Sequence, residues 1–242
     1  MIQEIITCHC NECNSVNIEK NGTDHKGSQK YHCLDCNAYG TLDTQNRSYP
    51  RHFRELVLRA YRERSSMRGI TRIFGIARQT LARWLEEEAA ILPDLAETLE
   101  PPQEDDVLEL DELWSFVFKK SEKRWIWIAL CRRTRQVVAY YIGDRSEQSC
   151  RNLWKRIPPA YRKLTSYSDF WKAYEQVFSS ETHQSVGKES GETNHVERWN
   201  NTLRQRLARF VRRTLSFSKS DFFHEIVLKL YLFYYNSECP IS

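Results

Sequence analysis

The chain has 242 residues, of which 40% are hydrophobic and 12% aromatic. This composition excludes a disordered protein, and the length suits two or three domains. The formal net charge of +4 decides little by itself. No stretch approaches the ~20 apolar residues of a membrane span, and no apolar signal segment opens the chain, which predicts a cytoplasmic protein without a membrane partner.

The first 46 residues are predicted to form a small zinc-bound β-ribbon or finger. Two CxxC pairs are separated by nineteen residues, and their members are Cys10, Cys13, Cys33 and Cys36. Four thiolates at this spacing are a strong indication of tetrahedral Zn²⁺, which would supply the folding energy of so short a segment. The stretch between the pairs is expected to form a hairpin. A redox role is the less favoured alternative, and other possible zinc ligands are Cys8, His9, His25 and His32.

Residues 47–92 are predicted to form an all-α helix-turn-helix domain. Apolar residues recur at helical spacing from Phe53 to Leu85, and Gly75 interrupts them. Helix, glycine-containing turn, helix is a plan used to read DNA. The second helix of the pair should begin near Ala77 and present the candidate DNA-binding residues Arg78, Gln79, Thr80 and Arg83.

The local charge supports a nucleic-acid partner for this segment. Residues 51–84 contain nine arginines and two glutamates, which gives a net charge of +7 with histidine neutral. A basic helical segment of this kind suits phosphate binding. The alternative is a helical bundle used for packing or dimerisation. A proline-rich, acidic linker is expected at 93–106.

The remaining residues, 107–242, are predicted to form an α/β domain. Three apolar runs joined by short polar turns predict three antiparallel strands, at 107–118, 125–131 and 136–143. The expected later elements are a helix at 147–156, a strand at 164–168, a helix at 171–178, a strand at 183–188, and helices at 193–213 and 220–235. This order of elements is typical of the ribonuclease-H-like fold.

Three acidic residues stand where a metal-dependent nuclease or transposase needs carboxylates. Asp111 lies in an apolar strand, Asp169 follows a strand, and Glu197 lies near the start of an arginine-rich helix. Divalent ions need several oxygen ligands that converge from separate elements. Strand alternation places Asp111 and Glu109 on one face of the sheet and Glu112 on the other. For Asp169 the alternative role is a helix N-cap.

The predicted helix from Thr193 carries further candidates. Glu197 and Arg204 are seven residues apart, so they lie on nearly the same helix face. A guanidinium near a metal-binding carboxylate suits a DNA phosphate, whereas the alternative is a surface ion pair of little consequence. His195 could contact a metal or the scissile phosphate. A further candidate stripe for the DNA backbone consists of Arg206, Arg209 and Arg213.

These motifs together resemble the transposases of the insertion-sequence-one (IS1) family. The stretches that carry the resemblance are the two CxxC pairs, Leu110–Trp114 and above all 193–219, with its Glu-Arg, Leu-Arg-Gln and Leu-Ala-Arg pieces. The resemblance implies an N-terminal zinc finger, a helix-turn-helix that binds terminal inverted repeats, and a DDE catalytic core. It also implies that Asp111, Asp169 and Glu197 bind Mg²⁺ or Mn²⁺, and that Arg204 is the family's basic residue after the glutamate.

The activity expected from this resemblance is 3′-end cleavage of the element followed by strand transfer into target DNA. Two element ends must be joined, so a dimer or a higher oligomer on double-stranded DNA is expected, at the nucleoid. Two alternatives remain open. One is a DNA-binding regulator without catalysis, and the other is a structure-specific nuclease of the same fold.

Overall fold

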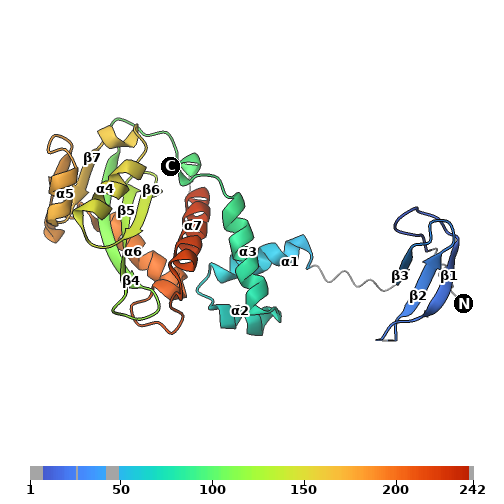
Figure 1. Ribbon diagram of the computed structural model, residues 1–242. Helices are drawn as coiled ribbons and strands as arrows, with labels where there is room; N and C mark the ends of the chain where they lie inside the picture. Colours follow the sequence, from blue (N-terminus) through green and yellow to red (C-terminus); the bar gives the residue numbers. More distant parts are fainter. Residues whose placement is uncertain (1–7, 26, 42–48, 240–242) are drawn as a thin grey trace, which may run out of the picture. The chain divides into compact units, whose positions relative to one another are not determined.

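The computed structural model describes residues 8–25, 27–41 and 49–239. Contacts divide the chain into two compact units, residues 1–53 and 54–242, and the two are described separately below (Figure 1). The helix-turn-helix segment and the α/β segment therefore belong to one unit. The finer domain boundaries at 46, 92 and 106 stay a prediction.

The N-terminal unit is built on a small antiparallel sheet. Its strands β1 (Ile18–Thr23), β2 (Gln29–Cys33) and β3 (Tyr39–Thr41) are ordered β1-β2-β3. The predicted hairpin is present between β1 and β2, and Gly27 turns the chain there with φ of 83°. Only glycine adopts this left-handed backbone without strain, which explains its place in the turn.

Three helices follow, as the apolar periodicity predicts. They are α1 (Arg51–Tyr61), α2 (Met67–Phe74) and α3 (Arg78–Ile91). Ser66 caps α2 by accepting a hydrogen bond from the Gly69 N–H. Gly75 ends α2 with φ of 70°, and its N–H donates to the Thr71 carbonyl. The predicted order of helix, glycine-containing turn and helix is therefore present around Gly75.

The segment predicted as a linker, 93–106, contains a short helix. Asp94 and Glu97 form a capping box around a short 3₁₀ helix, η1 (Leu95–Thr98). The side chain of Gln136 then holds the following backbone, donating to the Thr98 carbonyl at 2.7 Å and accepting from the Glu100 N–H at 2.9 Å. This segment is thus fixed to the α/β part of the chain by side-chain to backbone bonds.

A five-stranded mixed sheet forms the centre of the larger unit. Its strand order is β6-β5-β4-β7-β8. Strands β4, β5 and β6 pair antiparallel as predicted, whereas β7 and β8 run parallel to β4. The bounds are β4 (Val107–Phe116), β5 (Lys123–Cys131), β6 (Val137–Gly143), β7 (Thr165–Ser168) and β8 (His183–Ser185).

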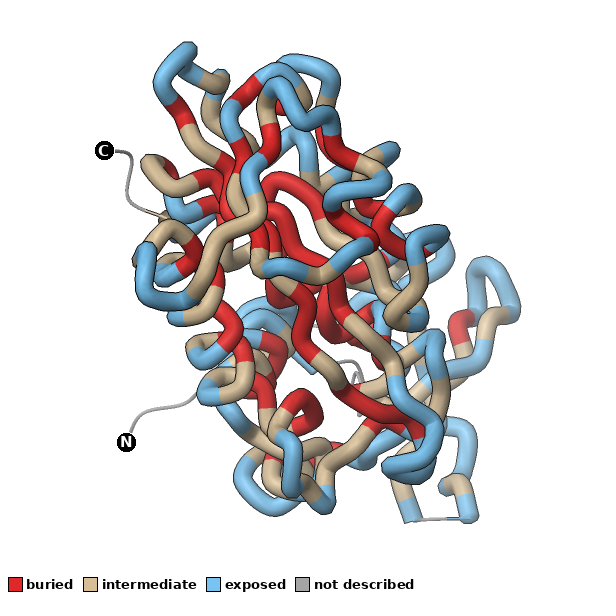
Figure 2. Tube along the Cα trace, turned by 90° about the vertical axis from the view of Figure 1, so that its left-hand side faces the viewer, coloured by how far each residue is buried: buried red, intermediate tan, exposed pale blue. Residues whose placement is uncertain are grey.

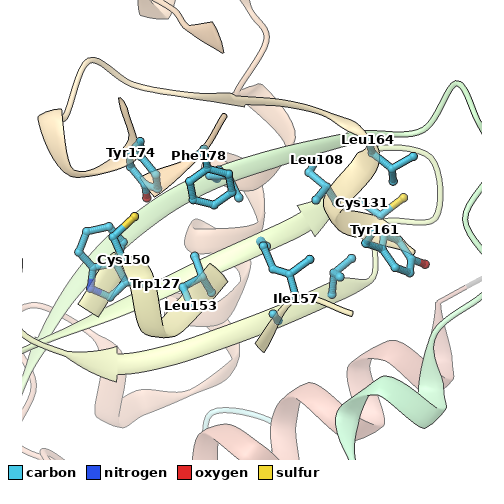
Figure 3. Close-up of a cluster of buried hydrophobic side chains, with 14 of the residues drawn as sticks. Leu108, Trp127, Cys131, Cys150, Leu153, Ile157, Tyr161, Leu164, Tyr174 and Phe178 are labelled. Atoms are coloured by element: carbon cyan, nitrogen blue, oxygen red, sulfur yellow. The ribbon is translucent and has the colours of Figure 1, made fainter. Parts of the chain in front are cut away.

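Helices cover both faces of this sheet (Figure 1). One face packs against α4 (Glu147–Arg156) and α5 (Lys172–Val177), and the buried cluster between them includes Leu108, Trp127 and Leu153 (Figure 3). The other face contacts α6 (Asn194–Arg206) and α7 (Asp221–Glu238). Short 3₁₀ turns complete the unit: η2 (Tyr161–Lys163), η3 (Lys188–Ser190) and η4 (Ala208–Phe210). Buried residues run through the interior of the larger unit, and exposed residues lie mostly at its periphery (Figure 2).

Alternation along β4 divides its side chains between the two faces, as predicted. Leu108 and Leu110 enter the core cluster with α4 and α5, and Glu112 accepts a hydrogen bond from Tyr174 of α5. Glu109 and Asp111 instead bond to residues of α6. The face that carries Asp111 is therefore the face that α6 covers.

The predicted helix over 193–213 is wrong in its last third. Helix α6 ends at Arg206, because Leu207 adopts an extended backbone with φ of −120° and ψ of 106°. Residues 208–210 form only the turn η4, and Ser218 bridges to Val117 beyond it. Residues 207–220 thus form a separate segment between α6 and α7. Within the described residues every helix is too short or too polar to cross a bilayer.

Candidate active site and zinc site

Four cysteine sulfurs converge in the N-terminal unit. The Sγ atoms of Cys10 and Cys36 are 3.5 Å apart, as are those of Cys13 and Cys33. All four sulfurs lie within 4.8 Å of one another, and Cys8 is not in the group. In a tetrahedron with bonds of 2.3 Å, two ligands are about 3.8 Å apart. The cluster therefore has the size needed to bind Zn²⁺.

The surroundings of the cluster act unequally on its thiols and hold the two CxxC turns together. Neighbouring thiols of the cluster raise the pKa of Cys36 to about 12 and also raise that of Cys13. Backbone N–H groups of Cys13 and Glu12 lower the pKa of Cys10 to about 7. Asp35, inside the second CxxC turn, accepts hydrogen bonds from Ser15 and from Asn17, which follow the first. These bonds lower the pKa of Asp35, so the link stays ionised at neutral pH. The chain thus aligns its two ligand pairs through a carboxylate outside the ligand set.

The three predicted carboxylates line one cleft in the larger unit. Asp111 comes from β4, Asp169 from the end of β7 and Glu197 from the first turn of α6, and the cleft has a volume of about 320 Å³. The oxygen atoms of these acids lie farther apart than the cysteine sulfurs. Among the described residues, the four cysteines are the only group of three or more such side chains whose ligand atoms all lie within 4.8 Å of one another. The acids share a cleft rather than a closed coordination shell.

Electrostatics show that the cleft is rich in negative charge. Burial raises the pKa of Asp111 to about 7, helped by the neighbouring charges of Glu112, Asp169 and Glu197. The Glu112 N–H donates to Asp111 Oδ1 at 2.8 Å and opposes this rise. Carboxylates raise one another's pKa only when they are near enough to repel. A cation placed among them would remove that repulsion.

Asn200 is a further polar residue of the cleft that the sequence did not single out. It lies one turn after Glu197 on α6, and its Nδ2 donates to Asp111 Oδ2 at 2.6 Å. Asn200 lines the cleft, and its Oδ1 is buried with no hydrogen-bond partner among the described residues. A buried oxygen with no donor is costly unless a cation or water meets it. The oxygen-rich donor set therefore fits a hard divalent cation such as Mg²⁺.

Cations line the same cleft beside the acids. Arg204 is half-buried, and its guanidinium donates to the carbonyls of Trp114 and Phe210 at 3.3 Å each. Burial, and then the charge of Arg212, lower the pKa of Arg204, although arginine stays protonated at any physiological pH. Lys188 and Arg212, which the sequence analysis did not select, are exposed at the cleft. The arrangement suits a phosphate that bridges a metal and a basic wall.

Glu109, also missed as a functional residue, anchors the start of α6. Its side chain is fully buried, and its Oε2 accepts the backbone N–H groups of His195 and Val196 at 2.9 and 3.0 Å. Its Oε1 lies 2.7 Å from His195 Nδ1 and accepts from Arg132 Nε at 2.7 Å. A carboxylate at a helix N-terminus satisfies free N–H groups and complements the helix dipole. His195 therefore bonds to Glu109 and is not among the residues that line the cleft.

The helix-turn-helix candidates lie where the sequence predicts. Arg78 and Gln79 are exposed at the first turn of α3, and Thr80 is partly buried. Arg83 is exposed and pairs with Glu87 at 3.6 Å, one turn along the helix. The N-terminal end of α3 thus offers polar side chains to solvent.

The candidate stripe of Arg206, Arg209 and Arg213 is not formed. Arg206 pairs with Glu63, near the end of α1. Arg209 is buried, and it donates to the Tyr61 hydroxyl at 2.6 Å and to Ser218 Oγ at 3.0 Å. Of the three, only Arg213 is exposed. The helix ends before the stripe can continue, so the prediction of a single backbone-tracking row is corrected.

Comparison with known proteins identifies the family. The sequence profile of IS1 transposases matches residues 107–236. The chain belongs to the IS1 transposase family. It is 36% identical over 126 residues to the InsB protein of insertion element iso-IS1n from Shigella dysenteriae, covering 52% of this chain and 93% of that protein.

Two further relatives give the same picture. An IS1 InsB protein of Shigella flexneri is 37% identical over 124 residues, covering 51% of this chain and 92% of the relative. The IS1 4 InsB protein of Escherichia coli K12 is 36% identical over 124 residues, covering 51% of this chain and 72% of the relative. The IS1-family resemblance read from the sequence motifs is therefore confirmed.

Proposed function

We propose that this IS1-family transposase binds the terminal inverted repeats of its element, cuts their 3′ ends and joins them to target DNA. The observation that carries the proposal is the cleft in which Asp111, Asp169 and Glu197 meet Arg204. The mixed sheet order β6-β5-β4-β7-β8 with α6 on one face supports a ribonuclease-H-like core. Zn²⁺ at the four cysteines and Mg²⁺ at the cleft are the proposed cofactors.

In this proposal some residues of the cleft bind the metal and others bind the scissile phosphate. Asp111, Asp169, Glu197 and the orphan Oδ1 of Asn200 would hold Mg²⁺. When bound, Mg²⁺ supplies a more acidic water and charge stabilisation for the departing oxygen. Arg204 is fixed by two backbone carbonyls, so its guanidinium is already oriented for the scissile phosphate before DNA arrives. Lys188 and Arg212 extend this basic wall.

The proposed reaction has two in-line displacements at one site. A water oxygen first forms a bond to the phosphorus at the element end, the bond from phosphorus to the 3′ oxygen breaks, and a free 3′ hydroxyl results. That hydroxyl then attacks a target phosphodiester, and the target's own 3′ oxygen leaves. Because two element ends must be joined, at least two copies of the chain would assemble on the double-stranded DNA.

The test is a Mg²⁺-dependent cleavage and strand-transfer assay on labelled duplexes from the flanks of the gene. We expect joined products from the wild type, and a loss of at least about 100-fold in Asp111→Asn, which corresponds to roughly 3 kcal/mol of lost transition-state stabilisation. Asp144→Asn is the matched control, because Asp144 is an exposed aspartate outside the cleft. Cleavage without joining would indicate a nuclease, and tight binding without cleavage would indicate a regulator.

A further inference from the structure

A second cleft, which we call the basic cleft, opens between the helix-turn-helix and the segment after α6. It has a volume of about 700 Å³, and its walls come from α2, α3, residues 207–220 and α7. Its lining contains five cationic side chains and no carboxylate: Arg68, Arg72, Arg78, Arg209 and Lys219. All of these residues belong to the larger unit.

The exposed cations of the basic cleft differ from their neighbours outside it. Arg83, on α3 but outside the cleft, pairs with Glu87, and Arg206 at the end of α6 pairs with Glu63. In the part of the chain that the structure describes, Arg68, Arg72, Arg78 and Lys219 form no ion pair and are exposed. Like charges on one surface repel unless an anion joins them. Their grouping therefore favours an anionic ligand.

Arg209 gives an independent indication of the same ligand. Its side chain is only 8% exposed, yet it lines the cleft. Its guanidinium donates to the Tyr61 hydroxyl, Ser218 Oγ and the Phe223 carbonyl, all of which are neutral. Among the described residues no carboxylate is ion-paired with it. A buried charge without a counter-ion is costly, and an anion in the cleft would supply that counter-ion.

Three helices begin at the basic cleft. Met67 is the first residue of α2, Arg78 is the first residue of α3, and Ser220 caps α7, and all three residues line the cleft. The N-terminus of a helix carries a partial positive charge and favours phosphate groups. Together with the five side-chain cations, the helix ends make the cleft electropositive from several directions.

The apolar part of the cleft lining indicates a ligand larger than inorganic phosphate. The lining also contains apolar side chains, among them Phe217, Phe223 and Leu215, and Leu215 is 99% exposed. A mixture of cations and apolar surface matches the phosphates and sugars of a nucleic-acid strand. Gln79, a predicted DNA contact of α3, lies at the same cleft. The position beside the recognition helix therefore favours DNA over a free anion.

The segment 207–220 also connects this cleft to the active-site cleft. Arg204 and Arg212 line the active-site cleft, whereas Arg209 and Leu215 line the basic cleft. These residues alternate along one short stretch of chain. We propose that the basic cleft binds the phosphodiester backbone of one strand of the duplex that α3 reads, and that residues 207–220 guide this strand to the active site. The identity of the ligand rests on the proposed function.

The test compares two triple variants with the same change in charge. Arg68→Ala/Arg72→Ala/Lys219→Ala removes three exposed cations from the basic cleft, and Arg151→Ala/Lys155→Ala/Lys163→Ala removes three exposed cations elsewhere. Binding to element-end duplexes is measured over a range of salt concentrations, with Ca²⁺ in place of Mg²⁺ to prevent cutting. Each phosphate contact contributes about 0.9 to the slope of log affinity against log salt.

We expect the cleft variant to lose about 2 to 3 from that slope and to bind at least about tenfold more weakly at low salt, while the control loses less than about 1. Single variants Arg68→Ala and Lys219→Ala, each losing about 1, would show the same trend if the triple variant folded poorly. Equal slopes for the two triple variants would overturn the basic-cleft proposal alone. If the wild type bound with a steeper salt dependence than the cleft variant but never cut DNA in Mg²⁺, the proposed function alone would be overturned. If the wild type bound no duplex at all, both proposals would be overturned.

Discussion

At the scale of single residues, the environment of Asp111 opposes its ionised form. Asp111 lies half-buried in strand β4, beside Glu112 and near two other carboxylates. Without a cation, burial and this repulsion favour the protonated acid, which raises its pKa to about 7. In the absence of a cation, ionised Asp111 therefore destabilises the folded protein near neutral pH.

The contribution of Asp111 to the free energy of unfolding should depend on pH. In the unfolded chain an aspartate has a pKa of about 3.9, so between pH 4 and 7 the folded protein binds the extra proton. The free energy of unfolding contributed by Asp111 is therefore greatest at low pH and is lost as pH rises through about 7. We expect Asp111→Asn to be more stable than the wild type by about 2 kcal/mol at pH 8 and equal to it near pH 4, measured by urea unfolding without divalent cations.

Asp144→Asn should behave in the opposite way. Hydrogen bonds from Ser146 and Ser149 lower the pKa of Asp144, so its ionised form stabilises the fold above the unfolded pKa. We expect this variant to be less stable than the wild type at pH 8 and to approach it in acid. The explanation for Asp111 would be wrong if both variants shifted stability in the same direction at pH 8.

At the scale of elements, α6 shows what the sequence could and could not predict. The apolar stripe from Val196 correctly predicts a helix that carries Glu197 and Arg204 into one cleft. The same stripe continues through Phe210 without a proline or glycine, so nothing local announces the end at Arg206. That end comes from contacts distant in sequence, because the Arg64 N–H donates to the Arg206 carbonyl at 2.6 Å and Tyr61 holds Arg209.

Glu109 is a second case in which local pattern was insufficient. Alternation correctly placed Glu109 on the face of Asp111, but several acids in one strand compete for the same role on sequence alone. Only the position of α6 shows that Glu109 receives the helix N-terminus while Asp111 faces the cleft. The sequence pattern thus predicts the face of each acid, and the packing of α6 decides which acid faces the cleft.

The second prediction follows from the Glu109 anchor. Glu109→Gln keeps one acceptor oxygen for donors from His195, Val196 and Arg132, so some of them lose their partner. We expect a loss of about 3 kcal/mol in the free energy of unfolding, measured in urea. We also expect reduced strand transfer at temperatures where the variant is still folded, because the start of α6 positions Glu197.

Asp106→Asn separates this positioning role from simple loss of stability. Asp106 is another buried carboxylate, paired with Arg133 at 2.7 Å, but it has no bond to α6. We expect it to lower stability while leaving strand transfer by the folded protein within about twofold of wild type. Equal losses of activity in the two variants, at matched folded fractions, would contradict a positioning role for Glu109.

At the scale of the whole molecule, the helix-turn-helix is part of the body that carries the active site. Lys229 of α7 donates to the Ala89 carbonyl of α3 at 2.8 Å, and Tyr234 bonds to Glu88 of the same helix. Arg62 lies with its guanidinium 3.5 Å from the ring centroid of Tyr234. The sequence predicted a linker at 93–106 but not these contacts. Each contact joins residues more than one hundred positions apart, so it leaves no local signal in the sequence.

The last prediction concerns how the two compact units unfold. Contacts between α3 and α7 should make residues 54–242 melt in one cooperative transition, while the small N-terminal unit depends on its metal. We expect calorimetry of the full chain to show this transition in Cys10→Ser at a temperature within about 2 °C of wild type. Zinc analysis should give one ion per chain in wild type and none in Cys10→Ser.

Cys8→Ser is the matched control, because Cys8 lies two residues away but outside the group of four sulfurs. It should retain zinc, whereas loss of zinc from both variants would show that Cys8 belongs to the ligand set. Two separate transitions within residues 54–242 would show that the helix-turn-helix melts independently of the sheet. In that case the contacts of α7 with α3 would be too weak to hold a recognised DNA end in a fixed position relative to the active site, and the guiding role of residues 207–220 would lose its structural basis.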